Sequence, residues 1–406
     1  MQTADWIIVG AGFAGLTAAN RLAELCPDDS IVLIDAQRVG FGAAGRNTGF
    51  MIDLPHDLNS DSYTNKREED LKQIRLNRAA IDYARQMAEE KELGDSFNFC
   101  GKYHGAASDK GEKHLQDFAR GLESMGEDFS TLTASEMKTL TGSDFYTGGL
   151  FTPGAAIIQP AAYVRKLAER LPANVTLYEN SPVRSVQPGK NPLVTTDRGS
   201  VQGGRVLMTV NGQAESFGFF KGKFLHVFTY GSMTRQLSDA EQKRLGGKDE
   251  WALIPADPMG STVRRIREGR IVVRNTFTYN PDMSTSRKQV ERIGKAHDRS
   301  FRKRFPMLDD VGMEHRWGGH LCISLNNGHG FGQLEEGIYA GVCQNGIGVA
   351  KGTLSGLMLA EEVAGGRHPL LPDFKSCGLP SSLPPLTSLG APMVMAWREL
   401  SAGVEK

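Results

Sequence analysis

The stretch Ile7-Ile8-Val9-Gly10-Ala11-Gly12-Phe13-Ala14-Gly15-Leu16 decides the fold of this chain. The apolar run that ends at Val9 is too short for a free helix and predicts a buried strand. The glycines that follow have the spacing G-x-G-x-x-G. Gly10 permits a tight turn, Gly12 lets the backbone approach a pyrophosphate, and Gly15 lets the next helix pack on the strand. Apolar residues at helical spacing over 16–23 predict that helix, whose N-terminus would face a diphosphate.

A second apolar run, Ile31–Ile34, ends in Asp35. An acidic residue at the end of the second strand is placed to accept hydrogen bonds from ribose hydroxyls. A lone glycine cluster is more often an ordinary turn. Here the cluster lies between a strand and a helix and is followed by the acid, so the context predicts dinucleotide binding rather than a purely structural turn. The stretch itself leaves FAD and NAD open.

Composition narrows the class of protein. The chain has 406 residues with 47 basic and 47 acidic side chains, which suits two globular domains and gives no support for nucleic-acid binding. The residues before the first strand lack the basic and apolar regions typical of a signal peptide, so none is expected, and no apolar run approaches the roughly 18 residues of a membrane span. Five cysteines without C-x-x-C pairing predict neither a disulfide framework nor a metal site. We therefore expect a cytoplasmic protein.

The segment after Asp35 carries a family resemblance. Small residues surround Arg46 and Asn47 in the run Gly42-Ala43-Ala44-Gly45-Arg46-Asn47-Thr48-Gly49. Together with the first glycine motif, this run resembles the FAD-binding oxidoreductases of the D-amino acid oxidase superfamily, and most of all the γ-glutamylputrescine oxidase-like amine oxidases. Their second motif reads GASGRNGG, from which this chain departs by Ala44 and Thr48.

The end of the chain resembles the same family. The run Arg316–Ser324, a short strand near 338–341 and the loop Gln344–Thr353 are followed by a helical pattern. A second strand, small-residue loop and helix is hard to explain for NAD alone. The family pattern GYNGxGVA matches from Asn345 onward, although Gln344 replaces the aromatic residue. In the resembled enzymes this segment covers the flavin ring, where the helix dipole stabilises negative charge.

The resemblance implies the residues that bind FAD. They are Gly10, Gly12, Phe13, Ala14, Gly15, Asp35, Ala36, Gln37, Arg38, Ala43, Ala44, Gly45, Arg46, Asn47, Thr48, Val183, Cys322, Asn345, Gly346, Ile347, Gly348 and Val349. Sarcosine-oxidase-like relatives attach the flavin to a cysteine near the position of Cys322, whereas the putrescine-type relatives bind FAD non-covalently. We expect non-covalent FAD, with a covalent link at Cys322 as the alternative.

The expected fold is an α/β Rossmann-like FAD-binding domain with an α+β second domain built on a mixed or antiparallel sheet. The FAD-binding domain is expected to comprise 1–55, 155–215 and 315–368. The substrate-binding domain would comprise 56–154 and 216–314, and the tail 369–406 would pack on the FAD domain.

Candidate catalytic residues are His320, Arg265 and Tyr103. His320 belongs to the strand expected near the flavin, and Tyr103 could border a substrate pocket. A predicted hairpin carries several arginines whose guanidinium groups could hold a substrate carboxylate, although a solvated sheet face with paired charges is the competing interpretation. These arginines are Arg264, Arg265, Arg267, Arg270 and Arg274.

The resemblance implies oxidation of a C–N bond by hydride transfer to flavin N5, giving an imine, with O2 reoxidising the flavin to release hydrogen peroxide. The substrate would be a secondary or N-substituted amine, such as a γ-glutamyl polyamine or a cyclic imino acid, with a carboxylate favoured by the arginines. Three alternatives stay open: a flavin dehydrogenase that uses a quinone or another acceptor, a non-catalytic nucleotide-binding protein and, less favoured, an NAD-dependent dehydrogenase.

Overall fold

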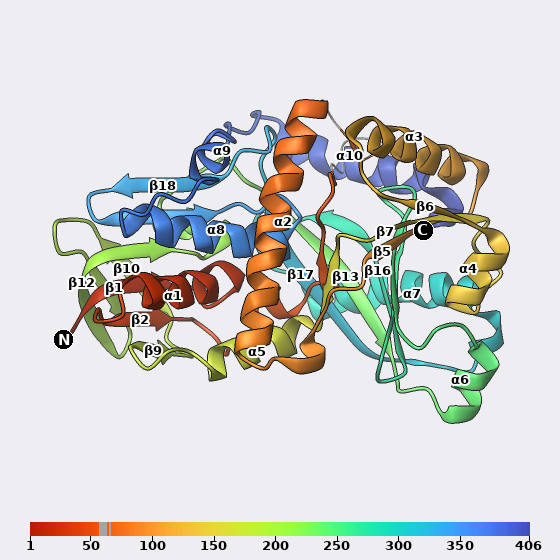
Figure 1. Cartoon of the computed structure of the whole chain (residues 1–406), viewed down its shortest axis with the longest axis horizontal. Helices are drawn as coiled ribbons and strands as arrows, with labels where there is room; N and C mark the ends of the chain where they lie inside the picture. Colours follow the sequence, from red (N-terminus) through yellow and green to blue (C-terminus); the bar gives the residue numbers. More distant parts are fainter. Residues whose placement is uncertain (57–62, 65) are drawn as a thin grey trace.

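A computed structural model of the protein describes residues 1–56, 63–64 and 66–406. Two large sheets lie side by side, each with its own set of helices, and a long helix runs across the front of the molecule (Figure 1). That helix is α2 (Arg67–Glu90), which packs on α8 (Gly348–Val363) and α3 (Asp109–Met125).

The first sheet is the predicted nucleotide-binding sheet. β1 (Gln2–Val9) pairs in parallel with β2 (Ile31–Ile34) and β12 (Gly199–Met208), so the carboxyl ends of these strands meet at one edge. The order continues as β10-β11-β12-β1-β2-β9, and β19 joins β12 on the other side. The remaining strands are β9 (Val175–Tyr178), β10 (Val183–Gln187), β11 (Leu193–Thr196), β18 (Gly330–Glu335) and β19 (Ile338–Val342).

Two helices with glycine-rich starts pack together beside this sheet. α1 (Phe13–Leu25) follows β1, and α8 follows β19 more than 300 residues later. They approach closely because α8 carries Gly356, where an added Cβ would lie 2.1 Å from the carbonyl oxygen of Ala14. The guanidinium of Arg21 donates to buried Glu361 across the same interface, at 2.6 Å for Nη2. α5 (Pro160–Glu169) completes this layer.

The second sheet forms the other half of the molecule and has the order β17-β13-β16-β15-β14-β5-β7-β6. Most of its pairs are antiparallel, while β14 and β5 are parallel, so the expected mixed sheet is confirmed. Its strands are β5 (Lys102–Ala106), β6 (Ser130–Thr133), β7 (Gly148–Thr152), β13 (Leu225–Thr234), β14 (Trp251–Pro255), β15 (Thr262–Ile266), β16 (Arg270–Tyr279) and β17 (Met313–Ile323).

Short elements surround these sheets. A small third sheet has the order β3-β8-β4. Its strands are β3 (Phe50–Met51), β8 (Ala156–Ile158) and β4 (Phe97–Asn98). The other α-helices are α4 (Ala134–Thr141), α6 (Asp239–Leu245), α7 (Arg287–Arg304), α9 (Leu371–Lys375) and α10 (Thr387–Ser401).

Two segments, β17 and part of the C-terminal tail, pack on a different half of the molecule from the one expected. β17 was expected with the first sheet, but it pairs along its length with β13 of the second sheet. The tail was expected to pack on the FAD-binding half. α9 does contact α8, whereas α10 lies on β16, where the backbone N–H of Phe277 donates to Glu399 at 2.7 Å. Main-chain pairing with β13 decides the placement of β17, and the bond from the Phe277 N–H to the Glu399 side chain holds α10 on β16. The remaining domain boundaries stay a prediction.

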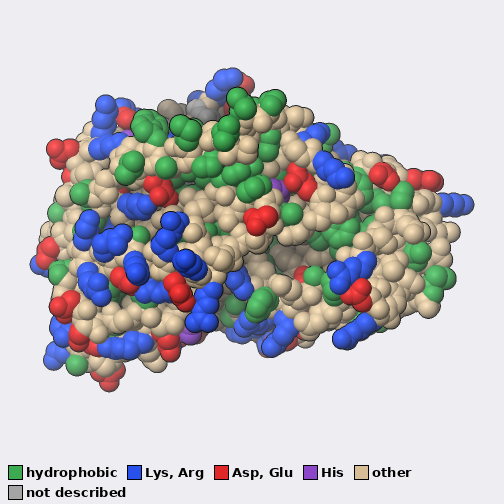
Figure 2. Space-filling view, turned by 180° about the vertical axis from the view of Figure 1, so that it is seen from behind, with side chains coloured by type: hydrophobic (Ala, Val, Ile, Leu, Met, Phe, Trp, Pro, Cys, Tyr) green, Lys and Arg blue, Asp and Glu red, His purple; other side chains and the backbone are tan. Residues whose placement is uncertain are grey.

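The surface agrees with the balanced composition. Figure 2 shows basic and acidic side chains interspersed over one face, with hydrophobic side chains gathered along its upper part. None of the described helices is both long and apolar enough to cross a membrane. The described residues contain no group of three or more His, Cys, Asp or Glu side chains that could hold a metal ion.

The contact between α1 and α8 generates a stability prediction. Gly356→Ala should lower the free energy of unfolding by about 1–3 kcal/mol, because the new methyl group would overlap the Ala14 carbonyl. Gly390→Ala on α10 is the matched control, since its Cβ would meet no atom within 4 Å and alanine favours a helix. Urea denaturation should therefore shift the two variants in opposite directions. Equal shifts would contradict the proposed tight crossing.

Candidate active site

A cavity of about 580 Å³ lies at the carboxyl ends of β1 and β2, and it brings the two glycine-rich segments together. Gly10, Gly12 and Ala14 line it from the first segment, and Gly346 and Gly348 line it from the second. Among the described residues, no side chain caps the N-terminus of α1 or of α8. Free N–H groups and the positive ends of two helix dipoles therefore face one cavity, which suits an anionic ligand.

The three glycines of the first motif have different surroundings. Gly10 has φ +103°, a conformation that disfavours any side chain. An added Cβ at Gly15 would lie 1.8 Å from the Gly10 carbonyl oxygen, so Gly15 is required for helix–strand packing. At Gly12 an added Cβ would meet only the Ala44 Cβ, at 3.7 Å. The protein itself therefore leaves this space open, as a pyrophosphate in close contact with the backbone would require.

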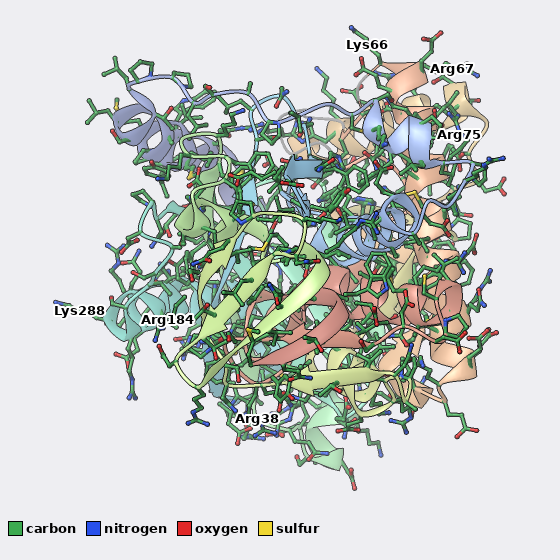
Figure 3. All side chains as sticks on the ribbon, turned by 90° about the vertical axis from the view of Figure 1, so that its left-hand side faces the viewer. Arg38, Lys66, Arg67, Arg75, Arg184 and Lys288 are labelled. Atoms are coloured by element: carbon green, nitrogen blue, oxygen red, sulfur yellow. The ribbon has the colours of Figure 1, made fainter. Side chains whose placement is uncertain are left out.

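Asp35 connects two backbone segments at the rim of the cavity. Its Oδ2 accepts from the backbone N–H of Ala11 at 2.7 Å, and its Oδ1 accepts from that of Gln37 at 2.8 Å. Burial raises the pKa of this carboxyl above its ordinary value, against the effect of those two bonds. Carboxylate oxygens have further lone pairs, so ribose hydroxyls could still donate to them. Arg38 lies on the exposed rim, at the lower edge of Figure 3 and far from Lys66, Arg67 and Arg75.

The loop that carries Arg46 and Asn47 is held mainly by its own bonds. Arg46 donates to the carbonyl oxygens of Phe41, at 2.7 Å, and Gly318, at 3.3 Å. Asn47 donates to Ala44 and accepts from the N–H of Gly49. Trp317 of β17 also donates to the carbonyl oxygen of Arg46, at 2.9 Å. The bonds with Gly318 and Trp317 connect β17 of the second sheet to the loop that lines the cofactor cavity, and Arg46 takes part in both of them.

Asn345 shapes the second segment. It has φ +50°, and its Oδ1 accepts from the backbone N–H of Ser324 at 2.7 Å. Its amide nitrogen donates to the carbonyl oxygens of Asn327 and Gly328, both at 3.1 Å. These bonds tie the loop before α8 to the loop after β17, so the N-terminus of α8 has a fixed direction.

Most of the predicted cofactor residues line this cavity. They are Gly10, Gly12, Phe13, Ala14, Asp35, Ala36, Gln37, Arg38, Ala43, Ala44, Arg46, Asn47, Val183, Cys322, Gly346 and Gly348. Gly15 and Gly45 are instead packed against Gly10 and Gly40. Thr48, Ile347 and Val349 line a neighbouring cavity of about 80 Å³, and Asn345 and Ile347 line a third of about 730 Å³. Further residues that line the cavity were not among the predicted cofactor residues; they include Thr209 and Asn211, which follow β12, and Gln344, where the second loop departs from the family pattern.

Cys322 is buried in the wall of the cavity. Its Sγ donates to Oδ1 of Asn211 at 3.3 Å. The neighbouring Cys343 thiol and burial raise the pKa of Cys322 well above its ordinary value. The thiolate is the reactive form of cysteine, so this environment keeps Cys322 unreactive.

His320 lines the same cavity and ends a chain of three side chains, of which the other two were missed. Nε2 of His226 is hydrogen-bonded to Oε2 of Glu215 at 2.6 Å, and Nδ1 of His226 is hydrogen-bonded to Nε2 of His320 at 3.1 Å. Burial, with His226 as a smaller contribution, lowers the pKa of His320 to about 4.

Two candidate catalytic residues lie away from the three cavities. Arg265 is buried, and its guanidinium donates to the carbonyl oxygens of Gly246 and Lys248 at 2.7 and 3.0 Å. Tyr103 packs on Phe151, with ring centroids 4.9 Å apart. Both side chains make contacts inside the second half of the molecule. The expectation that they lie at the catalytic site is therefore wrong. Of the hairpin arginines, Arg274 is the one that lines a cavity, the small one beside Gly346–Val349.

The different roles of Gly12 and Gly15 can be separated experimentally. Gly12→Ala should leave the melting temperature of the apoprotein nearly unchanged and weaken FAD binding by about tenfold or more, because the methyl group enters the open space at the helix N-terminus. Gly15→Ala should lower the melting temperature instead. Calorimetry of the apoproteins and FAD titration provide both values. A Gly12→Ala protein that bound FAD like the parent would contradict this assignment.

His320 predicts a pH dependence of stability. Its folded pKa of about 4 lies below the ordinary value near 6.5, so between these values the unfolded chain binds a proton that the folded chain does not. Its contribution is complete above about pH 6.5 and is lost as the pH falls, by about 2 kcal/mol at pH 5. In urea denaturation at pH 7 and 5, His320→Asn apoprotein should lose less stability than the parent. The same loss in both proteins would refute the burial of neutral His320.

Comparison with known proteins gives the family. The family model described as FAD dependent oxidoreductase matches residues 5–362. Gamma-glutamylputrescine oxidoreductase of Escherichia coli is 25% identical over 400 residues, covering 96% of this chain and 91% of that protein. Glycine oxidase from Geobacillus kaustophilus is similar in structure, with a TM-score of 0.76, 16% identity and coverage of 92% of this chain and 98% of the other.

L-amino acid deaminase from Proteus myxofaciens, solved in complex with anthranilate, has a TM-score of 0.73 at 16% identity, with 92% of each chain covered. These structural neighbours confirm the expected fold. The open helix N-termini and the space at Gly12 fit the cofactor that the family uses. The chain belongs to the FAD dependent oxidoreductase family, and it is an FAD-dependent oxidoreductase.

Proposed function

We propose that the protein oxidises the C–N bond of a secondary or N-substituted amine that carries a carboxylate. The observation that supports this most is the position of Arg274. Its guanidinium lines the small cavity together with Thr48 and the loop Gly346–Val349, at the end of the cofactor site where the flavin ring is expected. Among the described residues no acidic side chain forms an ion pair with Arg274, whereas Arg267 and Arg270 are paired.

The surroundings of Arg274 keep it available for an anion. Burial lowers the pKa of Arg274 to about 10, which leaves it charged at neutral pH. Its guanidinium carbon lies over the Phe277 ring, 4.5 Å from the ring centroid, a cation–π contact that supplies no acidic partner. An arginine without an acidic partner in a cavity suits a carboxylate, which it can bind with two parallel hydrogen bonds.

The same region disfavours a positive charge on the substrate. His56 borders the small cavity, and burial, followed by the charges of Lys102, Arg274 and Lys351, lowers the pKa of His56 to about 3. A bound amine would experience the same desolvation and the same positive charges, both of which favour its neutral form. The lone pair of a neutral amine is what hydride removal from the adjacent carbon requires.

FAD, when bound, supplies the acceptor for that hydride. The protein would hold its diphosphate at the N-terminus of α1 and its ring at the N-terminus of α8, where partial positive charge stabilises the reduced form. We propose non-covalent binding, supported by the protonated thiol of Cys322. Acid precipitation tests this point: flavin released into the supernatant supports it, and flavin that stays with the protein indicates the covalent link. We also propose O2 as the electron acceptor.

The activity is tested by anaerobic mixing of the holoenzyme with N-substituted amino acids, cyclic imino acids and γ-glutamyl amines. At least one should bleach the flavin, and readmitted air should restore the colour with release of hydrogen peroxide. If only a quinone or a dye restored the flavin colour, that class of compound and not O2 would be the electron acceptor. A flavin that dithionite reduces but that none of these amines bleaches would contradict the proposed function.

Arg274→Gln should raise KM for a carboxylate-bearing amine by about 10- to 100-fold, because a charge-assisted bidentate contact is lost. Arg267→Gln is the matched control on the same hairpin, since Arg267 is exposed and pairs with Asp95 and Glu250. It should leave KM unchanged. The effect at Arg274 should also vanish for an amine without a carboxylate. Similar KM values for the two variants would exclude Arg274 as the carboxylate site.

A further inference from the structure

The largest of the three cavities, about 730 Å³, continues from the small cavity that contains Arg274. His56 and Ile347 line both cavities. Phe277 connects them as well, because one side of its ring carries the Arg274 guanidinium and the residue also lines the large cavity. A ligand whose carboxylate lay on Arg274 could therefore extend past Phe277 into the larger space.

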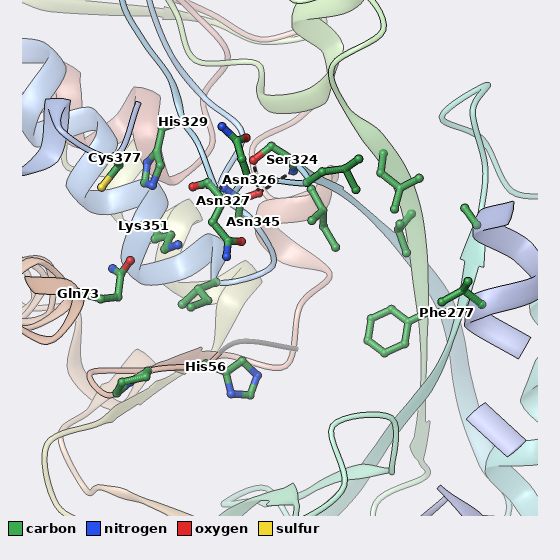
Figure 4. A pocket seen from close by; sticks show the side chains of 18 of the residues that line it. His56, Gln73, Phe277, Ser324, Asn326, Asn327, His329, Asn345, Lys351 and Cys377 are labelled. Atoms are coloured by element: carbon green, nitrogen blue, oxygen red, sulfur yellow. Dashed lines mark hydrogen bonds between the residues drawn. The ribbon is translucent and has the colours of Figure 1, made fainter. Parts of the chain in front are cut away.

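The large cavity has two unlike walls (Figure 4). One carries amides and Lys351, from α2, the loop after β17 and the start of α8. The amides include Gln73, Asn326 and Asn345. Ser324 and Asn345 are bonded to each other in this wall. The amide wall is thus structured by its own hydrogen bonds, and it ties the loops to the helix.

The opposite wall is apolar. Leu225 and Val227 of β13, Phe277 of β16, Ile323 of β17 and Met395 of α10 belong to one hydrophobic cluster, and all five line the cavity. The acidic residues of the lining, Glu69 and Asp70, both come from α2. Among the described residues, therefore, no acidic side chain on the apolar wall could pair with a positively charged group of the substrate.

The size of this space is also informative. A cavity of 730 Å³ lies within the roughly 300–1,000 Å³ that enclose drug-sized ligands. A small imino acid held at Arg274 would leave most of it unused. We propose that the substrate carries an extended apolar substituent of several carbons, which lies along the apolar wall while its carboxylate binds Arg274. This inference rests on the proposed function, from which it takes the carboxylate.

Redox-inert ligands test the inference without turnover. Straight-chain carboxylates from acetate to octanoate are titrated into the holoenzyme and followed by the change in flavin absorbance and by thermal shift. Each added methylene should tighten binding by about fourfold, as expected for burial of a CH2 group. An affinity that stays flat or falls beyond propionate would overturn the inference. If the series tightens but no amine bleaches the flavin, the apolar compartment stands and the proposed oxidation fails.

Two methionines of α10 provide a matched pair of variants. Met395 lines the cavity, whereas Met393 on the same helix is 72% exposed. Met395→Asp should weaken octanoate binding by about tenfold or more and leave acetate within about twofold, because only the long chain reaches the apolar wall. Met393→Asp should change neither. Equal effects of the two variants on octanoate would overturn the inference.

If Met395→Asp does not fold, Met395→Ala replaces it. The smaller loss of apolar contact should weaken octanoate binding by about three- to tenfold, again with acetate unchanged. An unchanged octanoate affinity in this variant would count against the proposal in the same way.

Discussion

The architecture depends on the close crossing of α1 and α8. Both helices begin in glycine-rich loops, and both N-termini open into one cavity because Gly356 lets α8 rest on the backbone of Ala14. A side chain at this crossing would push the helices apart and turn their N-termini away from each other. Among the described residues no side chain caps either N-terminus, and the diphosphate of FAD at one end and the reduced flavin at the other would offset the cost of these open N–H groups. Bound cofactor would therefore stabilise the crossing of α1 and α8.

Hydrogen bonds from the second sheet to the loops of the cofactor site hold the two halves of the molecule against each other. Trp317 of β17 binds the carbonyl oxygen of Arg46, and Asn345 ties the start of α8 to the loop after β17. Residues 319–322 of β17 line the cofactor cavity, and Arg274 of β16 lines the small cavity beside Gly346–Val349, where we propose that the flavin ring lies. Burial and nearby positive charges lower the pKa of His56 there, and the same surroundings would favour a neutral amine beside a bound carboxylate.

The sequence could predict what local patterns encode. The glycine spacing, Asp35 at the end of β2 and the glycine loop before α8 each adjoin the element that they start or end, so their chemistry can be read from neighbours in the chain. The same holds for the capping box of Thr133 and Glu136, which the structure shows at the start of α4. These signals located most of the cofactor cavity.

What could not be predicted depends on register between distant strands. Alternation along the hairpin separates the faces of Arg264 and Arg265, but it does not say which arginine lies beside the loop before α8. The structure selects Arg274, because β16 lies between β13 and β15. The bond between His226 and His320 likewise follows from pairing of β13 with β17.

We propose that both helix N-termini bind one FAD and that Arg274 faces the substrate side of its ring. A crystal structure of the holoenzyme with a bound straight-chain carboxylate would show both features at once. We expect the diphosphate at the backbone of Gly12–Ala14, the ring against Gly346–Gly348 and the carboxylate within hydrogen-bond distance of Arg274. A flavin ring away from α8, or a carboxylate bound elsewhere with Arg274 turned from the cavity, would contradict it.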